Sequence, residues 1–192
     1  EQTPAVLDFA TQVPHSALRG FVMGQDDSEQ EDEATDAQLA EMKALVKEAL
    51  EAGALGFSTS RTSLHKTAAG VLVAGTSAAH RELFVIGEAL AETGCGVFEV
   101  ADEHVTLGED IQWLEDLAVG MGRPVVVNLS QTDTAPELWR SVLAGIEAAA
   151  ERGAPLFAQS DNGSVKVTVG PAFQGEITLS ADNGTTTVED PG

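Results

Sequence analysis

Glu99 is the charged residue in this sequence whose position most calls for a chemical explanation. It stands in an otherwise apolar run at residues 96–100, which has the length of a buried strand. A carboxylate at the end of such a strand is partly removed from water, so it must pair with a cation, take up a proton or bind a metal ion. Arg61 follows the preceding apolar run. The sequence leaves two interpretations open, an ion pair with Arg61 or an oxygen ligand for a metal ion.

Other side chains that follow the apolar runs could hold a substrate. Asn128 and Gln131 carry neutral amide groups that suit a carboxylate or an amide. Because the ends of adjacent parallel strands project onto one surface, we expect Glu99 to face both Arg61 and Gln131. His15, in the segment VPHSALR, could act as a base or as a ligand, although a single histidine beside an apolar segment is more often structural.

Several familiar site motifs are absent from the sequence. It contains no phosphate loop, no Gly-x-Gly-x-x-Gly after a strand, no Gly-x-Ser-x-Gly elbow, and neither His-x-His nor His-Glu-x-x-His. The four histidines lie far apart along the chain, whereas a zinc site needs several ligands that converge on one point. We therefore expect that this chain alone does not form a zinc site.

A repeated pattern predicts the elements that position these residues. Four stripes of apolar residues at helical spacing predict helices, and each stripe ends at a glycine, which adopts the left-handed conformation after a helix without steric cost. An apolar run of strand length follows each glycine, and its nearly continuous apolar character is typical of strands buried on both faces. The glycines are Gly53, Gly94, Gly122 and Gly153, and the strands are expected at residues 54–57, 96–100, 124–129 and 154–158. Three capping boxes are expected at the helix starts: Thr35 with Gln38, Thr106 with Glu109, and Thr134 with Glu137.

The recurrence of helix, glycine, buried strand and polar loop is typical of a parallel α/β sheet. An antiparallel α+β domain is one alternative. An open, doubly wound sheet is the other, and it differs from a partial barrel in having helices on both faces. In parallel α/β folds the ligand site lies at the carboxyl ends of the strands, where this sequence places polar loops, while the loops at the opposite ends are short. The sequence therefore predicts a site for a small molecule at that edge of the sheet.

Composition excludes several classes of protein. The chain has 192 residues, with 10 Lys and Arg against 31 Asp and Glu, so its formal net charge is −21. A balance this acidic excludes nucleic-acid binding and attachment to an anionic membrane surface. No apolar run reaches the roughly 18 residues that would cross a membrane. Because there is a single cysteine, an internal disulfide is excluded, and a cytoplasmic location is expected.

The composition changes near residue 160, where leucine becomes rare and Gly, Thr, Ser, Asp and Asn take over. Val165 and Val167 alternate with polar residues, and Asn183-Gly184 is a signal for a two-residue hairpin. We therefore predict two parts, an α/β part at residues 1–159 and a small antiparallel β appendage or tail at residues 160–192.

Three segments of the sequence resemble a known family. PHSALRGFVMG, ATDAQLAEMKALVKEALEAGALGFSTSRT and HRELFVIGEALAETG are similar to the middle of the N-acyl-D-amino-acid deacylases, the third amidohydrolase family of the metal-dependent amidohydrolase superfamily. The resemblance covers residues 13–159, and the stretch at residues 42–62 is its most specific part. It implies a TIM-type (β/α) barrel, a small-molecule amide substrate and a divalent metal, zinc. Because a full barrel needs about 250 residues, we predict a partial TIM-type barrel with parallel strands.

The sequence also departs from the family pattern. Glu99 stands where the family carries a metal-binding histidine, and a second such histidine is expected where this chain has residues 128–131. The resemblance thus implies a divergent branch in which Glu99 could supply an oxygen ligand in place of an imidazole.

Two functions follow from the sequence. The first is a fragment of a metal-dependent amidohydrolase that hydrolyses the carbon–nitrogen bond of N-acyl amides, including N-acyl-D-amino acids, and that is inactive as this chain alone. The second is a non-catalytic binding module, or an incomplete fragment, that keeps the pocket and has lost the metal site. Because the edges of a partial barrel expose unpaired backbone groups, we also expect self-association.

Overall fold

The chain folds around one parallel β-sheet whose strands follow one another in chain order. The computed structural model describes residues 10–24, 33–103, 106–160, 164–168 and 185–189. Every neighbouring pair in the sheet is parallel, so the predicted parallel α/β class is confirmed and the antiparallel alternative is wrong. The strands are β1 (Val13–Pro14), β2 (Gly56–Ser60), β3 (Val97–Ala101), β4 (Val125–Asn128) and β5 (Leu156–Gln159).

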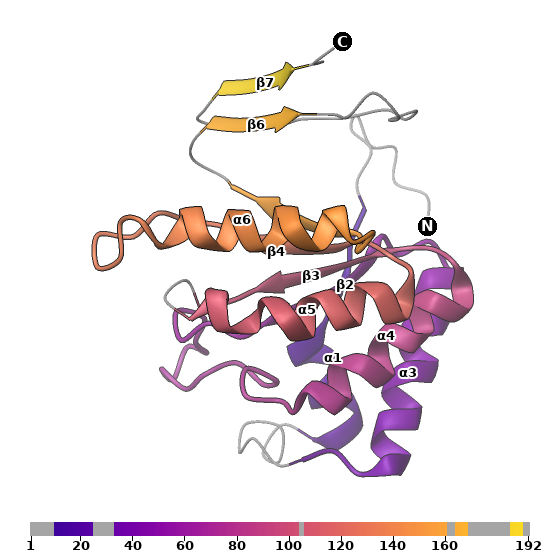
Figure 1. Cartoon of the computed structure of the whole chain (residues 1–192). Coiled ribbons are helices and arrows are strands. Elements are labelled where there is room, and N and C mark those ends of the chain that lie inside the picture. The colour runs from indigo at the N-terminus through magenta and orange to yellow at the C-terminus, as the bar shows by residue number, and fades with distance from the viewer. Residues whose placement is uncertain (1–9, 25–32, 104–105, 161–163, 169–184, 190–192) are drawn as a thin grey trace, which may run out of the picture.

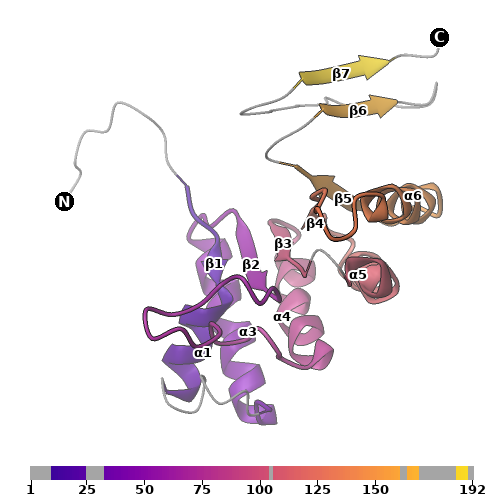
Figure 2. The same ribbon diagram turned by 90° about the vertical axis from the view of Figure 1, so that its left-hand side faces the viewer.

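In the part of the chain that the structure describes, helices cover one face of this sheet and leave the other open. They are α1 (His15–Met23), α3 (Asp36–Glu51), α4 (His80–Thr93), α5 (Leu107–Met121) and α6 (Leu138–Glu151). The strands follow a curve with α3, α4, α5 and α6 along its outer side (Figures 1 and 2). This arrangement is a sector of a β/α barrel and not a doubly wound sheet, which would carry helices on both faces. Among the described residues, no helix is long and apolar enough to cross a membrane.

Burial alternates along the strands, contrary to the prediction that both faces are buried. In β3, Phe98 and Val100 are fully buried beneath the helices, whereas Glu99 and Ala101 are only half-buried. Successive side chains of a strand point to opposite faces, and in the described part of the chain only the outer face is covered. The inner face is therefore free to carry polar groups.

The helix ends match the sequence only in part. Thr35 and Gln38 form the expected capping box before α3. The two other predicted boxes are wrong. The backbone of Thr106 is already helical and its hydroxyl donates to the Glu103 carbonyl, while α6 begins only after Glu137 because Thr132 and Ala135 make a separate turn.

Gly94 and Gly56 show why glycine recurs between a helix and the strand that follows it. Gly94 ends α4 in the left-handed conformation, with φ of 66°, as predicted. Gly56 begins β2 with φ of 152°, and its Cα lies so close to β3 that an added Cβ would come within 1.9 Å of the Val97 carbonyl oxygen. The close approach of β2 and β3 therefore depends on the absence of a side chain at Gly56.

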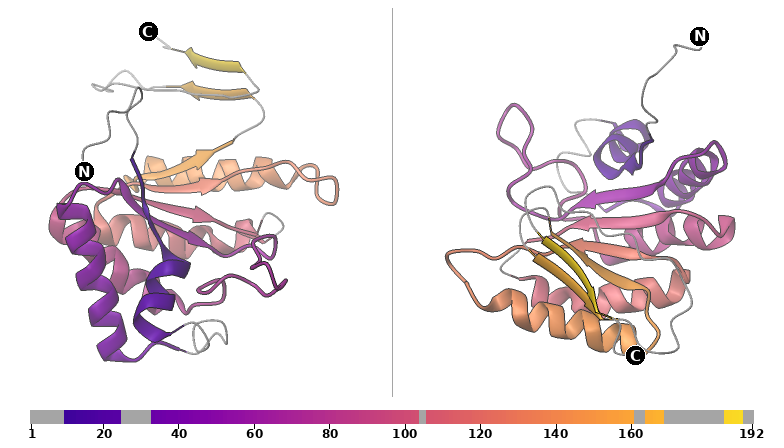
Figure 3. Two further views of the ribbon diagram at one scale, coloured as in Figure 1. Left: turned by 180° about the vertical axis from the view of Figure 1, so that it is seen from behind. Right: turned by 90° about the horizontal axis from the view of Figure 1, so that it is seen from above.

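The tail contains two further strands, β6 (Ser164–Thr168) and β7 (Thr185–Glu189), which pair in parallel (Figure 3). The predicted antiparallel pairing is wrong. Residues 169–184 separate the strands, so the connection is long enough for the crossover of a parallel pair, which needs about a dozen residues or more. The expected hairpin residues Asn183 and Gly184 lie outside the described residues. The predicted domain boundary at residues 159 and 160 stays a prediction.

Candidate functional site

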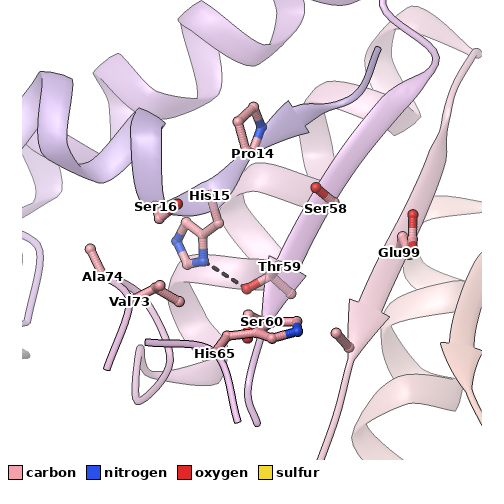
Figure 4. A pocket seen from close by; sticks show the side chains of 11 residues that line it. Pro14, His15, Ser16, Ser58, Thr59, Ser60, His65, Val73, Ala74 and Glu99 are labelled. Carbon is pink, nitrogen blue, oxygen red and sulfur yellow. Dashed lines mark hydrogen bonds between the residues drawn. The ribbon is translucent and has the colours of Figure 1, made fainter. Parts of the chain in front are cut away.

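A cavity of about 310 Å³ opens at the carboxyl ends of β1, β2 and β3. The strand ends and the first turn of α1 form one wall, and the segment between β2 and α4 forms the other (Figure 4). This is the edge of the sheet at which the sequence places a ligand site. The lining residues are Pro14, His15, Ser16, Ser58, Thr59, Ser60, His65, Val73, Ala74, Glu99 and Ala101.

The structure brings two of the five predicted site residues to this cavity. His15 and Glu99 line it, whereas Arg61, Asn128 and Gln131 do not. Glu99 is half-buried on the inner face of β3, and its register partner on β2 is Ser58. Glu99 is therefore available to a ligand in the cavity.

Arg61 does not form the expected ion pair with Glu99. Its guanidinium donates to the Ala78 carbonyl at 2.9 Å and lies 5.5 Å from the ring centre of Trp113. The reason is that side chains alternate between the two faces of the sheet along β2 and in the residue that follows it, Arg61. Arg61 shares the outer, helix-covered face with Thr59, while Glu99 lies on the inner face.

Asn128 and Gln131 hold the local backbone. The Asn128 Oδ1 accepts a hydrogen bond from the backbone N–H of Asp102 at 2.7 Å. The Gln131 Nε2 donates to the Pro136 carbonyl at 2.9 Å. Their contacts with a substrate stay predictions.

His15 is the centre of a buried hydrogen-bonded chain. Its Nδ1 lies 2.8 Å from the Thr59 hydroxyl, and its Nε2 lies 2.6 Å from Glu82 Oε1. Arg19 donates from Nη1 to Glu82 Oε2 at 2.5 Å. The exposed fractions of these four residues are 4% or less, so the chain of contacts is shielded from bulk water.

The charges in this chain of contacts can be assigned. Burial lowers the pKa of His15, although the hydrogen bond with Glu82 opposes the shift. Burial alone would raise the pKa of Glu82, but the hydrogen bonds from His15 and Arg19 and the positive charge of Arg19 outweigh it and lower that pKa. His15 is therefore neutral at pH 7, with Nε2–H donating to the Glu82 carboxylate and Nδ1 accepting from the Thr59 hydroxyl.

Sequence reasoning missed Arg19, Thr59 and Glu82. A signal for Arg19 was present, because His15 and Arg19 are four residues apart and so share one face of α1 with the buried Leu18. No comparable local signal identifies Glu82, whose contact with His15 spans 67 residues.

The segment between β2 and α4 closes over the site. The Ser60 hydroxyl and His65 Nδ1 are 2.8 Å apart at the cavity wall. Gly75 packs against the imidazole of His15, where an added Cβ would lie 2.5 Å from Nδ1. This segment therefore fixes both histidines that line the cavity.

No protein-family model matches the chain, and no curated protein matches it. Two solved structures are similar over 76% of the chain. One is a D-aminoacylase mutant in complex with copper chloride, with 25% identity and a TM-score of 0.60. The other is a D-aminoacylase described as defining a novel subset of amidohydrolases, with 24% identity and a TM-score of 0.59.

This chain has the fold of part of a D-aminoacylase. It spans 28% of the length of each of these proteins. The resemblance to the N-acyl-D-amino-acid deacylases and the predicted partial TIM-type barrel are thereby confirmed.

The metal implied by the D-aminoacylase resemblance does not fit the described residues alone. Among them, no group of three or more His, Cys, Asp or Glu side chains could hold a metal ion. Both ring nitrogens of His15 are already hydrogen-bonded, and the only carboxylate that lines the cavity is Glu99. Glu99 could supply one oxygen ligand, but one ligand does not make a metal site.

Asp102 is a buried carboxyl group that follows β3. Its Oδ1 accepts from the backbone N–H of Glu103 at 2.8 Å, and its Oδ2 has no hydrogen-bond partner among the described residues. Burial, together with the charge of Asp110, raises the pKa of Asp102 from 3.8 to about 6. Ionised Asp102 at neutral pH is therefore a source of instability.

Asp102→Asn is expected to stabilise the protein at pH 8 by about 1–3 kcal/mol. Between pH 3.8 and about 6 the folded state binds the proton more tightly than the unfolded state, so the favourable contribution of protonated Asp102 is lost as pH rises through about 6. Urea unfolding at pH 4 and pH 8 measures the difference, with exposed Asp116→Asn as control. A gain at pH 4 that disappears at pH 8 would contradict this assignment.

Proposed function

We propose that this chain is part of a hydrolase that cleaves the carbon–nitrogen bond of N-acyl amides, including N-acyl-D-amino acids, and that its cavity holds the acyl amide. The observation that carries the proposal is the cavity at the carboxyl ends of β1, β2 and β3 in a barrel sector similar to D-aminoacylase. In β/α barrels this edge of the sheet is where active sites lie.

The size and lining of the cavity support a small polar ligand. A volume of about 310 Å³ is at the lower end of the range for small-molecule sites. Three serine hydroxyls and one carboxylate can hydrogen-bond to an amide, and Val73, Ala74 and Ala101 can contact an acyl group. These residues bind and orient the amide in our proposal, while its hydrolysis needs ligands beyond those that the described residues supply.

The charge of the lining residues predicts which ligands the cavity binds more tightly. Of the described residues that line it, Glu99 is the only acidic one, and His15 is neutral. The carboxylate of an N-acyl-D-amino acid is therefore repelled by Glu99. Two unit charges about 4 Å apart in water repel by about 1 kcal/mol, which corresponds to about a fivefold loss of affinity.

Calorimetric titration of the chain with N-acetyl-D-amino acids tests the proposal. We expect binding of the N-acetyl compound, with an affinity about fivefold higher in Glu99→Gln, because the repulsion is removed. Glu109→Gln, on the exposed surface of α5, is the matched control and should leave the affinity unchanged.

The same samples should show no release of the amino acid, with or without added zinc, because the described residues contain no complete ligand set. Equal binding of the N-acetylated and free amino acids would contradict recognition of the amide. Unchanged affinity in Glu99→Gln would contradict its place beside the ligand.

A further inference from the structure

Three side chains, the first two of which line the cavity, stand in the order of a nucleophile, a base and a group that orients the base. We propose that Thr59, His15 and Glu82 form a triad that transfers acyl groups from esters to Thr59 and then releases them by hydrolysis, without a metal. This activity is distinct from the amide hydrolysis proposed above and does not depend on it.

The geometry meets the two contacts that such a triad requires. The Thr59 hydroxyl is 2.8 Å from His15 Nδ1, and Glu82 Oε1 is 2.6 Å from His15 Nε2. A nucleophile within hydrogen-bond reach of a base, with the base held by a third group, is the arrangement that activates hydroxyl nucleophiles. Because Glu82 accepts the Nε2 proton, the lone pair on Nδ1 is directed to the Thr59 hydroxyl.

The supporting contacts fix the triad in this form. Arg19 holds the second oxygen of Glu82 at 2.5 Å and keeps that carboxylate ionised. Gly75 and Phe57 pack against the imidazole of His15, the latter with ring centres 5.3 Å apart. Arg19 and Glu82 therefore act as positioning residues, whereas Thr59 and His15 would contact the acyl group.

Thr59 and His15 also form part of the cavity wall, although their exposed fractions are only 4% and 2%. Both line the cavity, and Figure 4 shows their hydrogen bond at its wall. Ser16, in the first turn of α1, lines the same cavity, and no side chain caps that turn. The first backbone N–H groups of a helix lack partners within the helix, so this turn can donate to the oxyanion of an acyl intermediate.

The reaction takes two steps. In the first, Thr59 Oγ1 bonds to the carbonyl carbon of the ester while its proton moves to His15 Nδ1, and the ester carbon–oxygen bond breaks as the leaving alkoxide takes that proton. In the second, water gives a proton to His15 Nδ1 and its oxygen bonds to the acyl carbon. The bond to Thr59 then breaks, Thr59 regains the proton, and the carboxylic acid leaves. The net reaction is ester and water to acid and alcohol.

Acetylation by p-nitrophenyl acetate, in the presence of a metal chelator, tests the triad. Release of p-nitrophenolate gives the rate, and mass spectrometry of peptides locates the acetyl group. We expect acetyl-Thr59 in the unmodified protein and its loss in Thr59→Val, which keeps the shape but removes the hydroxyl. His15→Gln should slow the acetylation of residue 59 by roughly 100-fold, the usual effect of removing a general base.

Two further variants separate catalysis from structure. Thr59→Ser keeps a hydroxyl and should be acetylated at residue 59, which a purely structural role would not require. Thr93→Val removes a threonine hydroxyl that bonds to the Ala89 carbonyl in α4, outside the cavity, and should leave the rate unchanged.

The pH profile provides a readout that does not depend on any variant. The charged groups that face His15 are Glu82 on α4, Arg19 on α1 and Arg61 after β2. Because burial lowers the pKa of His15 from 6.5, the rate of acetylation at Thr59 should be constant above pH 6.5 and fall only below it. An inflection above pH 6.5 would overturn the role of His15.

The proposal is overturned if acetyl groups appear on surface residues only, or if folded Thr59→Val releases p-nitrophenolate as fast as the unmodified protein. If Thr59→Val does not fold, peptide mapping and the pH profile of the unmodified protein decide the question. Loss of acetylation on addition of the chelator would equally overturn it.

Discussion

Gly56→Ala is expected to abolish the folded state. A Cβ at this position would lie 1.9 Å from the carbonyl oxygen, 2.6 Å from the nitrogen and 2.8 Å from the carbonyl carbon of Val97. All three atoms belong to the backbone of β3, so no rotamer change can relieve the clash. A φ of 152° adds backbone strain for any residue with a side chain. We expect a loss of more than about 4 kcal/mol, which is comparable to the whole stability of many domains.

Chemical unfolding followed by circular dichroism measures this loss. Gly120→Ala is the matched control, because Gly120 lies in α5 with no atom within 4 Å of an added Cβ. Alanine in an exposed helix is favoured over glycine, so this variant should gain roughly 0.5 kcal/mol. A cooperative unfolding transition of normal midpoint in Gly56→Ala would show that β2 and β3 are further apart than described.

Arg19→Met is expected to cost about 3–5 kcal/mol, the second-largest effect. Methionine has a similar length but no charge, so Glu82 would remain buried with only His15 as its partner. Removal of one member of a buried ion pair leaves the other charge without compensation. The surface pair of Arg140 and Glu137 provides the control, because Arg140→Met should change the stability by less than about 1 kcal/mol.

The loss in Arg19→Met depends on pH in a defined direction. The pKa of Glu82 is lowered in the folded state, so its ionised form contributes stability that is complete above pH 4.5 and is lost as pH falls below that value. The difference between Arg19→Met and the unmodified protein should therefore shrink below pH 4.5. A difference that grows on acidification would contradict the ion pair.

Much of the fold could be predicted because its signals are local. Each βα unit can be recognised in the sequence by an apolar stripe, a glycine and a short apolar run. All four expected strands are present. Strand limits were less accurate. Apolar residues stop at Phe57, but the ladder of β2 continues to Ser60 opposite Ala101, since the inner face of a partial barrel tolerates hydroxyls. Strand β1 went unrecognised because two residues, one of them proline, carry no periodicity.

The sequence predicts where the site lies, but it identifies only some of the residues that form it. His15 and Glu99, two of the candidates, line the cavity. Arg61 was expected beside Glu99 because it lies near the end of β2. Side chains alternate between the two faces along a strand, however, and this alternation directs Arg61 to the outer face. Thr59 and Glu82 depend on contacts across 44 and 67 residues, which no local pattern encodes.

The sequential strand order has a consequence for how the chain folds during synthesis. Each strand of the main sheet pairs only with the strands that precede and follow it in the chain. Two paired strands are therefore always translated one directly after the other. Chains fold from the amino terminus as they leave the ribosome. When β5 is translated, the β4 residues with which it pairs have already been translated. The sheet can therefore grow in the direction of translation, one unit at a time.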